Sequence, residues 1–419
     1  MRFTLLTFLC LITLVAYVQR SALGVPSKTI EGELGLTPQG MGLVWLAWYA
    51  GYAAFQLPSG WVADRLGSKA ALLLFAVVWS GLTSLVGLAT GFTGLAILWG
   101  LMGVAQAGIF PCATKAIGAT FLKTEQAFAS GMLACCMAGG AALSQEVTGR
   151  LFGPLSWRGI LAVYALPGLI WAAAFAFVPA PDRPKPKPAG PVAPVPWSRL
   201  FTDRDMLLLC GQQFQRAAAS ALFFTWFPRY LQETKGLSTA QSGSLAAWPL
   251  VAGVLGGLVG GTLSDWLLRR TGNERLSRQG LATAAMVVCA VVSFLAFRAE
   301  GAEAAVAFIS VASFCGYVGG VAAYATALAM GGTRVAPVFA TMNMAGNIGA
   351  GFFPFAVGQI VGLTGNWNLA ILLFAALYVG SGVCWALLNP KGTLFEERHD
   401  EPEKLDDPPD PVRGGDRPG

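Results

Sequence analysis

Charged side chains are scarce in this chain of 419 residues, because Asp, Glu, Lys and Arg together make up only 12% of it. A soluble domain usually carries about a quarter of such residues. Hydrophobic residues reach 55% and are accompanied by 52 glycines, and small residues let apolar helices approach closely within a bilayer. The composition therefore excludes a soluble protein and predicts a polytopic membrane protein in contact with the lipid bilayer.

Histidine is nearly missing as well. The one histidine, His399, lies in a polar tail, which excludes histidine-based metal or proton chemistry within the membrane. The eight cysteines lie in apolar runs without metal-ligand spacing, where cysteine behaves as a small hydrophobic residue. The sequence shows no nucleotide-binding loop, no nucleophile beside a base and no basic run with interleaved aromatics. We expect no enzyme activity, no metal, no cofactor and no nucleic-acid partner.

Apolar stretches of about 20 residues, long enough to cross a bilayer, occur twelve times in two sets of six. This pattern predicts an all-α membrane protein with twelve transmembrane helices in two pseudo-symmetric six-helix bundles. The predicted spans of the first set are 3–24, 39–58, 70–90, 94–120, 128–152 and 157–178. Those of the second set are 205–230, 242–264, 279–298, 303–330, 337–364 and 367–388.

A proline-rich segment, Pro179 to Pro196, separates the two sets. Proline at this density is incompatible with a helix and predicts an extended, semi-rigid linker. From Leu394 onward the chain is acidic and rich in proline and glycine, a composition typical of disorder. We expect an N-terminal bundle at 1–178, a cytoplasmic linker at 179–204, a C-terminal bundle at 205–390 and a disordered acidic cytoplasmic tail at 391–419.

The distribution of Lys and Arg predicts the orientation in the membrane. With a cytoplasmic N-terminus, fifteen of these residues lie in inner loops and six in outer loops, as the positive-inside rule requires. Reading the first span as a cleaved signal peptide would leave eleven spans and invert this bias. We therefore expect both termini on the cytoplasmic side of the plasma or inner membrane.

A short pattern recurs after the second span of each set, with its glycine and aspartate repeated 201 residues apart. The two copies comprise Gly60, Asp64, Arg65, Gly67 and Lys69, and Gly261, Asp265 and Arg269. An internal duplication of this kind is typical of transporters. The pattern resembles the loop 2–3 signature of the major facilitator superfamily, and this resemblance implies a conformational gate on the cytoplasmic side.

Within that superfamily, the chain resembles the anion:cation symporter family of sugar-acid carriers and sialin-like proteins. The resemblance is spread over both sets of spans and implies a symporter of small anions. The stretches that carry it are Tyr17–Arg20, Gln56–Trp61, Gly108–Pro111, Phe224–Leu231 and Asn343–Asn347.

Three of the charged residues within predicted spans stand out, because charge is costly at bilayer depth and points to function. Arg20 falls where the family places its substrate-binding arginine, and a guanidinium offers a planar fork that matches a carboxylate; the alternative is an arginine that reaches the outer interface. Arg216 either faces the cavity as a second positive group or makes a structural pair. Glu146 either pairs with Arg216 or Arg150, or carries a coupling proton.

The resemblance also places a set of polar residues in the cavity. Besides the two arginines this set includes Tyr52, Gln213, Tyr324 and Asn343, whose hydroxyl and amide groups can bond a polyol; ordinary helix packing is the alternative for the two tyrosines. Three positions depart from the family, because Gln19, Trp99 and Gln106 stand where proton-coupled members carry Asp or Glu, Arg and Glu. The usual coupling groups are therefore missing.

These observations predict a secondary active transporter of a small organic anion, such as a sugar acid or another carboxylate, working by alternating access. We expect a monomer whose partners are the anionic solute, the bilayer and a coupling proton or cation. An efflux carrier for apolar compounds and a non-transporting sensor of the same fold are the alternatives. The sequence leaves the solute, the coupling ion and the direction of transport open.

Overall fold

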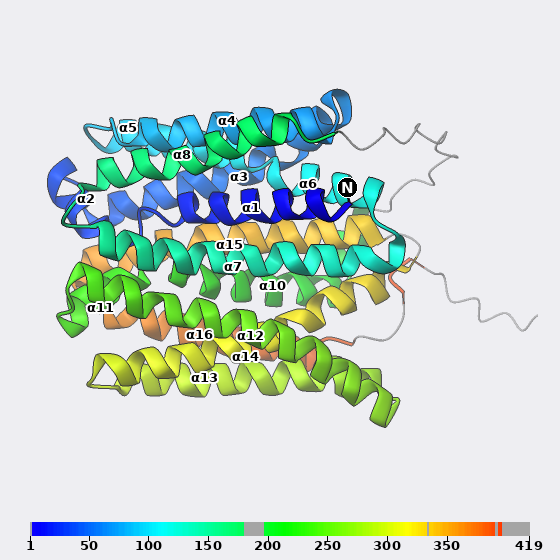
Figure 1. Cartoon of the computed structure of the whole chain (residues 1–419). Helices are drawn as coiled ribbons and strands as arrows, with labels where there is room; N and C mark the ends of the chain where they lie inside the picture. The colour runs from blue at the N-terminus through cyan, green and yellow to red at the C-terminus, as the bar shows by residue number, and fades with distance from the viewer. Residues whose placement is uncertain (1, 180–196, 333–334, 390–392, 396–419) are drawn as a thin grey trace, which may run out of the picture.

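The computed structural model describes residues 2–179, 197–332, 335–389 and 393–395, and within these ranges the regular elements are all helices. The helices run side by side and nearly parallel (Figure 1). Most of the predicted linker and tail, residues 180–196, 390–392 and 396–419, lies outside the described residues. A short helix, α9 (Trp197–Thr202), occupies the end of the predicted linker.

The first half of the protein comprises helices α1 to α8 and carries the first six predicted spans. Span four is divided into two helices at Ala107 and Gly108, and α2 is a short additional helix between spans one and two. The bounds are α1 (Arg2–Arg20), α2 (Ser27–Leu34), α3 (Pro38–Leu66), α4 (Ser68–Val86), α5 (Phe92–Gln106), α6 (Ile109–Thr120), α7 (Lys123–Leu151) and α8 (Trp157–Ala176).

The second half comprises helices α10 to α16 and carries the other six predicted spans. Span seven is divided into α10 and α11, and a π-helical turn, η1 (Arg275–Gly280), leads into α13. The bounds are α10 (Arg204–Phe224), α11 (Phe227–Lys235), α12 (Thr239–Thr271), α13 (Leu281–Arg298), α14 (Ala302–Gly331), α15 (Val335–Thr364) and α16 (Asn368–Leu387).

Ten helices of the described residues are long and apolar enough to cross a membrane. The other two predicted spans, α3 and α10, run parallel to them (Figure 1). In α10 the apolar residues are interrupted by Gln212, Gln213, Gln215 and Arg216, polar side chains of the kind that line a cavity. The arrangement agrees with the predicted twelve-helix membrane fold.

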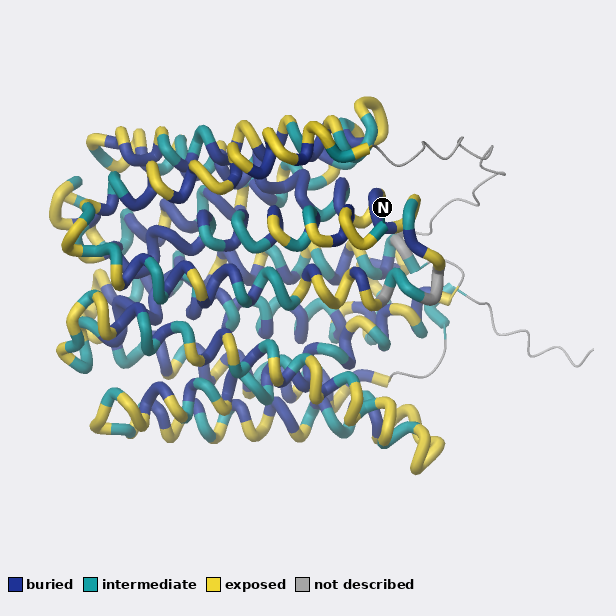
Figure 2. The backbone as a smooth tube through the Cα atoms, in the orientation of Figure 1, coloured by how far each residue is buried: buried dark blue, intermediate teal, exposed yellow. Residues whose placement is uncertain are grey.

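Exposed residues follow the outer faces of the bundle, and buried residues lie where helices face one another (Figure 2). The exposed side chains on these faces are large and apolar, as with Val78 and Leu85 of α4 and Val287 and Val291 of α13. A wide apolar surface of this kind marks contact with a membrane. The lipid bilayer is the medium that fits it.

The duplicated motif lies partly inside helices rather than in loops, which corrects the predicted span boundaries. Helix α3 continues to Leu66 and α12 continues to Thr271. The turn after α3 is made by Gly67 with φ 83°, and the turn after α12 by Gly272 with φ 61°, a region of φ that favours glycine. Gly60, Asp64, Gly261 and Asp265 are therefore helical residues.

The two halves meet where α3 faces α15 and where α7 faces α12. We call the end of the bundle that carries α2 and α11 the outer end; it is on the left of Figure 1, and Arg2 lies at the opposite, inner end. Near the outer end a Cβ added to Gly42 would lie 2.8 Å from the carbonyl oxygen of Pro354, and one added to Gly243 would lie 2.5 Å from that of Gln145. The backbones of the two halves thus touch there.

Toward the inner end the halves separate, and Figure 1 shows α7 and α12 diverging in that direction. Among the described residues, the innermost hydrogen bond between the halves runs from Asn347 of α15 to Gln56 of α3, at 3.4 Å. The other inter-half hydrogen bonds and ion pairs of these residues lie closer to the outer end. The structure is therefore closed on the outer side.

Candidate functional site

Arg20, the last residue of α1, lies in a cage of aromatic rings. Its guanidinium carbon is 4.0 Å from the ring centroid of Trp48, 5.1 Å from those of Tyr17 and Tyr49, and 5.7 Å from that of Tyr52. One guanidinium N–H donates to the hydroxyl of Tyr17 at 3.3 Å. Such cation–π contacts stabilise the charge among the rings.

The two halves both contribute to a small cavity beside Arg20. The first half supplies Arg20 and the aromatic residues of α3 and α5, and the second half supplies Phe224 and Thr225 at the end of α10. The lining residues are Arg20, Trp45, Trp48, Tyr49, Trp99, Phe224 and Thr225. Arg20 therefore points into the space between the halves rather than outward to lipid.

Arg216 of α10 is the second buried guanidinium, with a relative exposure of 8%. Its Nη2 donates to the side-chain oxygen of Gln213 at 2.9 Å, and its Nε has no hydrogen-bond partner among the described residues. A Cβ added to Gly320 of α14 would lie 3.1 Å from Nη1, so the close approach of α14 depends on that glycine. One donor of this buried charge therefore has no partner in the described part of the protein.

No carboxylate of the described residues lies within 4.0 Å of either guanidinium. Glu146 instead pairs with Arg150, one turn further along α7. Of the two pairing partners that the sequence left open for Glu146, Arg216 is therefore excluded. Arg20 and Arg216 therefore remain without a carboxylate partner in the described part of the protein.

Tyr317 of α14 links the surroundings of the two arginines, and sequence reasoning missed it. It interacts electrostatically with Arg216 and Tyr49 and also with Tyr17. Tyr17 and Tyr49 both contact Arg20. A single tyrosine in an apolar helix gives no sequence signal beyond its type, because its position depends on how α14 packs against α10.

The predicted polar residues divide into two groups. Tyr52 stacks on Trp48 beside Arg20, and the side-chain oxygen of Gln213 accepts a hydrogen bond from Arg216. The structure therefore places Tyr52 and Gln213 next to the two arginines. Tyr324 lies two turns further inward on α14 than Tyr317, is 40% exposed, and stacks on Phe339. Asn343 of α15 is half-buried and lies one turn from Asn347, which bonds the first half.

The positions where the coupling groups are missing hold structural amides. The Nε2 of Gln19 donates to the carbonyl oxygen of Tyr164 at 2.7 Å, and the Nε2 of Gln106 donates to that of Ala16 at 3.1 Å. These bonds tie α1 to α8 and to α5. Trp99, at the third position, packs edge-on against Trp45. Neither amide can release a proton.

The residues of the predicted gate contact their own halves at the inner end. Asp64 pairs with Lys115 of α6 at 2.6 Å, and Lys69 donates to the carbonyl oxygen of Ala176 at 2.7 Å. Arg65 lies 3.8 Å above the ring of Trp61. In the second copy the Nε of Arg269 bonds the backbone oxygen of Asp265. None of these contacts bridges the two halves.

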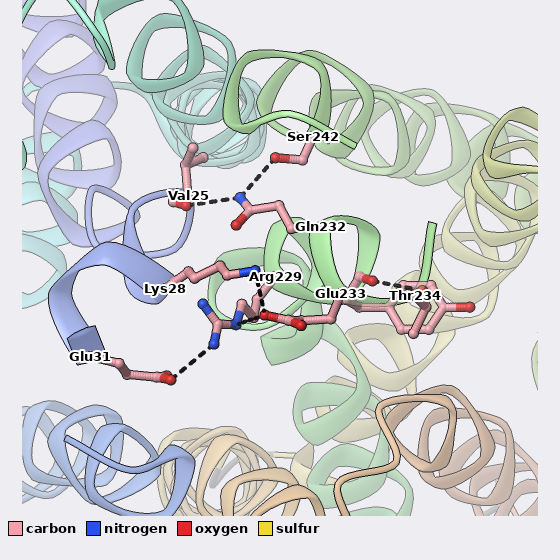
Figure 3. Close-up of polar contacts among 9 residues, drawn as sticks. Val25, Lys28, Glu31, Arg229, Gln232, Glu233, Thr234 and Ser242 are labelled. Atoms are coloured by element: carbon pink, nitrogen blue, oxygen red, sulfur yellow. Dashed lines mark hydrogen bonds and ion pairs between the residues drawn. The ribbon is translucent and has the colours of Figure 1, made fainter. Parts of the chain in front are cut away.

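A polar network joins the halves at the outer end (Figure 3). Arg229 of α11 is 3.1 Å from Glu31 of α2 and 3.2 Å from Glu233, and Lys28 of α2 is 3.1 Å from Glu233. Gln232 also donates to the carbonyl oxygen of Val25 at 3.1 Å. Sequence reasoning missed this network, since its partners are distant in the chain.

Two neighbouring carboxyls of α2, which lies between spans one and two, have opposite pKa shifts. Burial raises the pKa of Glu31 to about 7, although the charges of Arg229 and Lys28 oppose the shift; Glu233 adds to it. Hydrogen bonds from Trp157 and Arg158 lower the pKa of Glu33. Glu31 faces the other half, whereas Glu33 contacts α8 of its own half.

Comparison of the sequence with known proteins finds a matching family and similar transporters. The sequence model of the Major Facilitator Superfamily matches residues 9–338. A probable sulfoacetate transporter of Cupriavidus necator is 29% identical, with 94% of this chain and 95% of that protein covered. A probable galactarate/D-glucarate transporter of Escherichia coli is 27% identical, with 93% and 92% covered.

A similar fold occurs among solved structures. A bacterial homolog of the human lysosomal transporter Spinster, in an inward-facing and unoccupied conformation, gives a TM-score of 0.73 at 18% identity, with 92% of this chain and 93% of that chain covered. At this identity the likeness concerns the fold. It agrees with the arrangement of the helices described above.

Proposed function

Because this chain belongs to the Major Facilitator Superfamily, we propose that it is a membrane transporter of a small organic anion, built to expose one central site alternately to the two sides. Sugar acids, other carboxylates and sulfonates are the solutes that fit. The relatives named as sulfoacetate and galactarate/D-glucarate transporters support this solute class.

The observation that carries the proposal is the pair of buried guanidinium groups without a carboxylate. A charge at bilayer depth costs about 2.5–3.5 kcal/mol on insertion scales, and removing a charge from water is unfavourable unless it is paired. Among the described residues, Arg20 contacts aromatic faces and the hydroxyl of Tyr17, and Arg216 contacts the amide of Gln213. An anionic solute supplies the missing negative charge.

Alternating access follows from the placement of these groups. Arg20 belongs to α1 in the first half and Arg216 to α10 in the second half, so a bound anion contacts both halves. The outer end is closed in this structure, and the gate residues at the inner end contact only their own halves. Rocking of the halves about the anion would close the inner end and open the outer one.

We further propose the predicted bundles, 1–178 and 205–390, as the two rocking units, with both termini in the cytoplasm and a monomer as the working form. The inner end carries Arg2 at one terminus and Leu388 at the other, which supports placing both termini on the same side of the membrane. The efflux and sensor alternatives are not favoured, because the named relatives are transporters of small anions.

Uptake into liposomes that contain the purified protein tests the proposal. A panel of radiolabelled sugar acids, carboxylates and sulfonates is compared for the wild type, Arg20→Gln and Arg216→Gln. Arg298→Gln is the control, because Arg298 ends α13 at the outer end. We expect saturable uptake of at least one anion and its loss in Arg20→Gln. Full uptake in both cavity variants would falsify the anion site.

A further inference from the structure

Helix α15 packs against a neighbour of each of the two guanidinium groups. Tyr49, which contacts Arg20, packs against Gly351 of α15, where an added Cβ would lie 2.9 Å from the Cβ of Tyr49. Gln213, which bonds Arg216, packs against Gly346 of the same helix, where an added Cβ would lie 3.1 Å from its side chain. These two contact points are five residues apart, or about 7.5 Å of helix.

No carboxylate of the described residues pairs with either arginine. Tyr317 of α14 is near enough to Arg216 and to Tyr49 to interact electrostatically with both. The side-chain hydroxyl of Ser220 also interacts with Tyr317. Hydroxyl groups in such a position can form hydrogen bonds with the hydroxyl groups of a solute. They cannot neutralise either guanidinium.

The charges of Arg20 and Arg216 also favour one class of solute. A monoanion bound to Arg20 would leave Arg216 buried and uncompensated, and an unpaired buried charge is strongly unfavourable. A donor of Arg216, its Nε, lacks a protein partner in the described residues. A solute with an acid group at each end satisfies both guanidiniums at once.

We propose that the transported solute is a dianion, a short molecule with two acid groups joined by a hydroxylated or unsubstituted carbon chain, held by Arg20 at one end and by Arg216 at the other. This inference rests on the proposed anion transport and names its solute class. Arg216 is then the residue that determines specificity for a dianion over a monoanion. Because Arg20 belongs to the first half and Arg216 to the second, the bound dianion also draws the two halves together.

Matched pairs of anions test the inference in binding and in uptake. D-glucarate is compared with D-gluconate, and sulfoacetate with glycolate, so that one acid group is replaced by a neutral hydroxymethyl group in the first pair and by a hydroxyl in the second. Affinity is measured by isothermal titration of the purified protein and by competition for uptake into liposomes. We expect the dianion of at least one pair to bind about tenfold to a hundredfold more tightly than its monoanion, as charge-assisted hydrogen bonds predict.

The variants separate the two arginines. In Arg216→Gln the affinity for the dianion should fall by about tenfold to a hundredfold, whereas that for the monoanion stays within about twofold, so that the preference disappears. Arg216→Lys keeps the charge and should keep part of the preference. A thermal unfolding profile like that of the wild type, together with retained monoanion binding, shows that each variant is folded.

The outcomes distinguish this inference from the proposed function. Equal affinity for both members of every pair, binding of monoanions alone, or an equal loss for both anions in Arg216→Gln would overturn the dianion class while anion transport stands. If no member of either pair binds, the dianion class is likewise overturned. If Arg20→Gln and Arg216→Gln both leave every measured uptake unchanged, the anion site of the proposed function itself fails.

Discussion

Arg229 of α11 and Glu31 of α2 form an ion pair between the two halves of the protein, with Nη2 of the arginine 3.1 Å from Oε2 of the carboxylate. Both side chains are more than nine-tenths buried. Opening the outer end has to separate them and return each to water. The pair therefore contributes to the balance between the closed and open states of that end, and its charge determines how the balance depends on pH.

The outer end should close more readily at acidic pH. The pKa of Glu31 is raised from 4.5 to about 7 in this closed arrangement by burial, and exposure to water on opening should return it toward 4.5. A group with a higher pKa in the closed state binds its proton more tightly there, so falling pH stabilises that state. The effect begins near pH 7, is complete below about pH 4.5, and reaches at most about tenfold per pH unit.

Spin labels can measure this equilibrium. Gly32→Cys on α2 and Gly301→Cys before α14 provide open positions in the two halves, in a background without the native cysteines. Double electron–electron resonance distances should show more of the closed state at pH 5 than at pH 8. Glu31→Gln should remove this dependence. Glu33→Gln is the matched control, since Glu33 bonds Trp157 of its own half; a pH dependence that survives Glu31→Gln would contradict the prediction.

A side chain at Gly243 should prevent closure of the outer end. In α12 an added Cβ would lie 2.5 Å from the carbonyl oxygen of Gln145 in the other half, and overpacking of this kind costs about 1–3 kcal/mol. Gly243→Val should therefore shift the same spin-label distances toward the open state and reduce uptake about tenfold or more. Gly257→Val on the same helix meets nothing within 4 Å and should leave both unchanged.

Gln19→Glu should destabilise the protein instead of creating a coupling site. The Nε2 of Gln19 donates to the carbonyl oxygen of Tyr164, and a carboxylate would face that oxygen without a proton to donate. Loss of a buried hydrogen bond costs about 1–3 kcal/mol. Thermal unfolding in detergent should show a larger loss at pH 8 than at pH 5, where the protonated acid can donate. An unchanged unfolding temperature at both pH values would refute this role of the amide.

The fold was predictable from sequence because most spans are continuous apolar runs and each half repeats the motif around Asp64 and Asp265. The ends of α3 and α12 could not be predicted, because the polar residues at the inner end are helical although they face water. The pairing of Glu146 with Arg150 has a local signal in its spacing of four residues. The pairing of Glu31 with Arg229 has none, because 198 residues separate the two.

The site was predictable only in part, because some of its features depend on contacts between residues that are distant in the chain. Charge at bilayer depth drew attention to Arg20 and Arg216 without any knowledge of packing. The aromatic residues around Arg20 and the position of Tyr317 depend on how neighbouring helices are rotated, and sequence periodicity does not determine that rotation. Tyr324 illustrates the difference, because it shares a helix with Tyr317 but lies two turns further inward, where it is partly exposed.

Asp64 should matter for turnover and hardly at all for stability. Its ion pair with Lys115 is exposed, with side-chain exposures of 74% for Asp64 and 39% for Lys115, and exposed pairs contribute about 0–1 kcal/mol. Asp64→Asn should therefore leave the unfolding temperature and the anion affinity near those of the wild type. The saturating rate of uptake should fall severalfold, because closing the inner end brings this charged segment toward the other half and requires its charges to be paired again.

Glu125→Gln is the matched control for Asp64→Asn. Glu125 also forms a half-exposed ion pair at the inner end within the first half, with Arg2 at 2.9 Å, but it lies outside the duplicated motif. A general effect of losing a surface charge would slow both variants equally and would argue against a gate. The gate is supported if Asp64→Asn is slow while Glu125→Gln is not, and if Asp265→Asn in the second copy is slow as well. The duplicated aspartates then act in the movement of the two halves, since neither is needed to hold the closed outer end together.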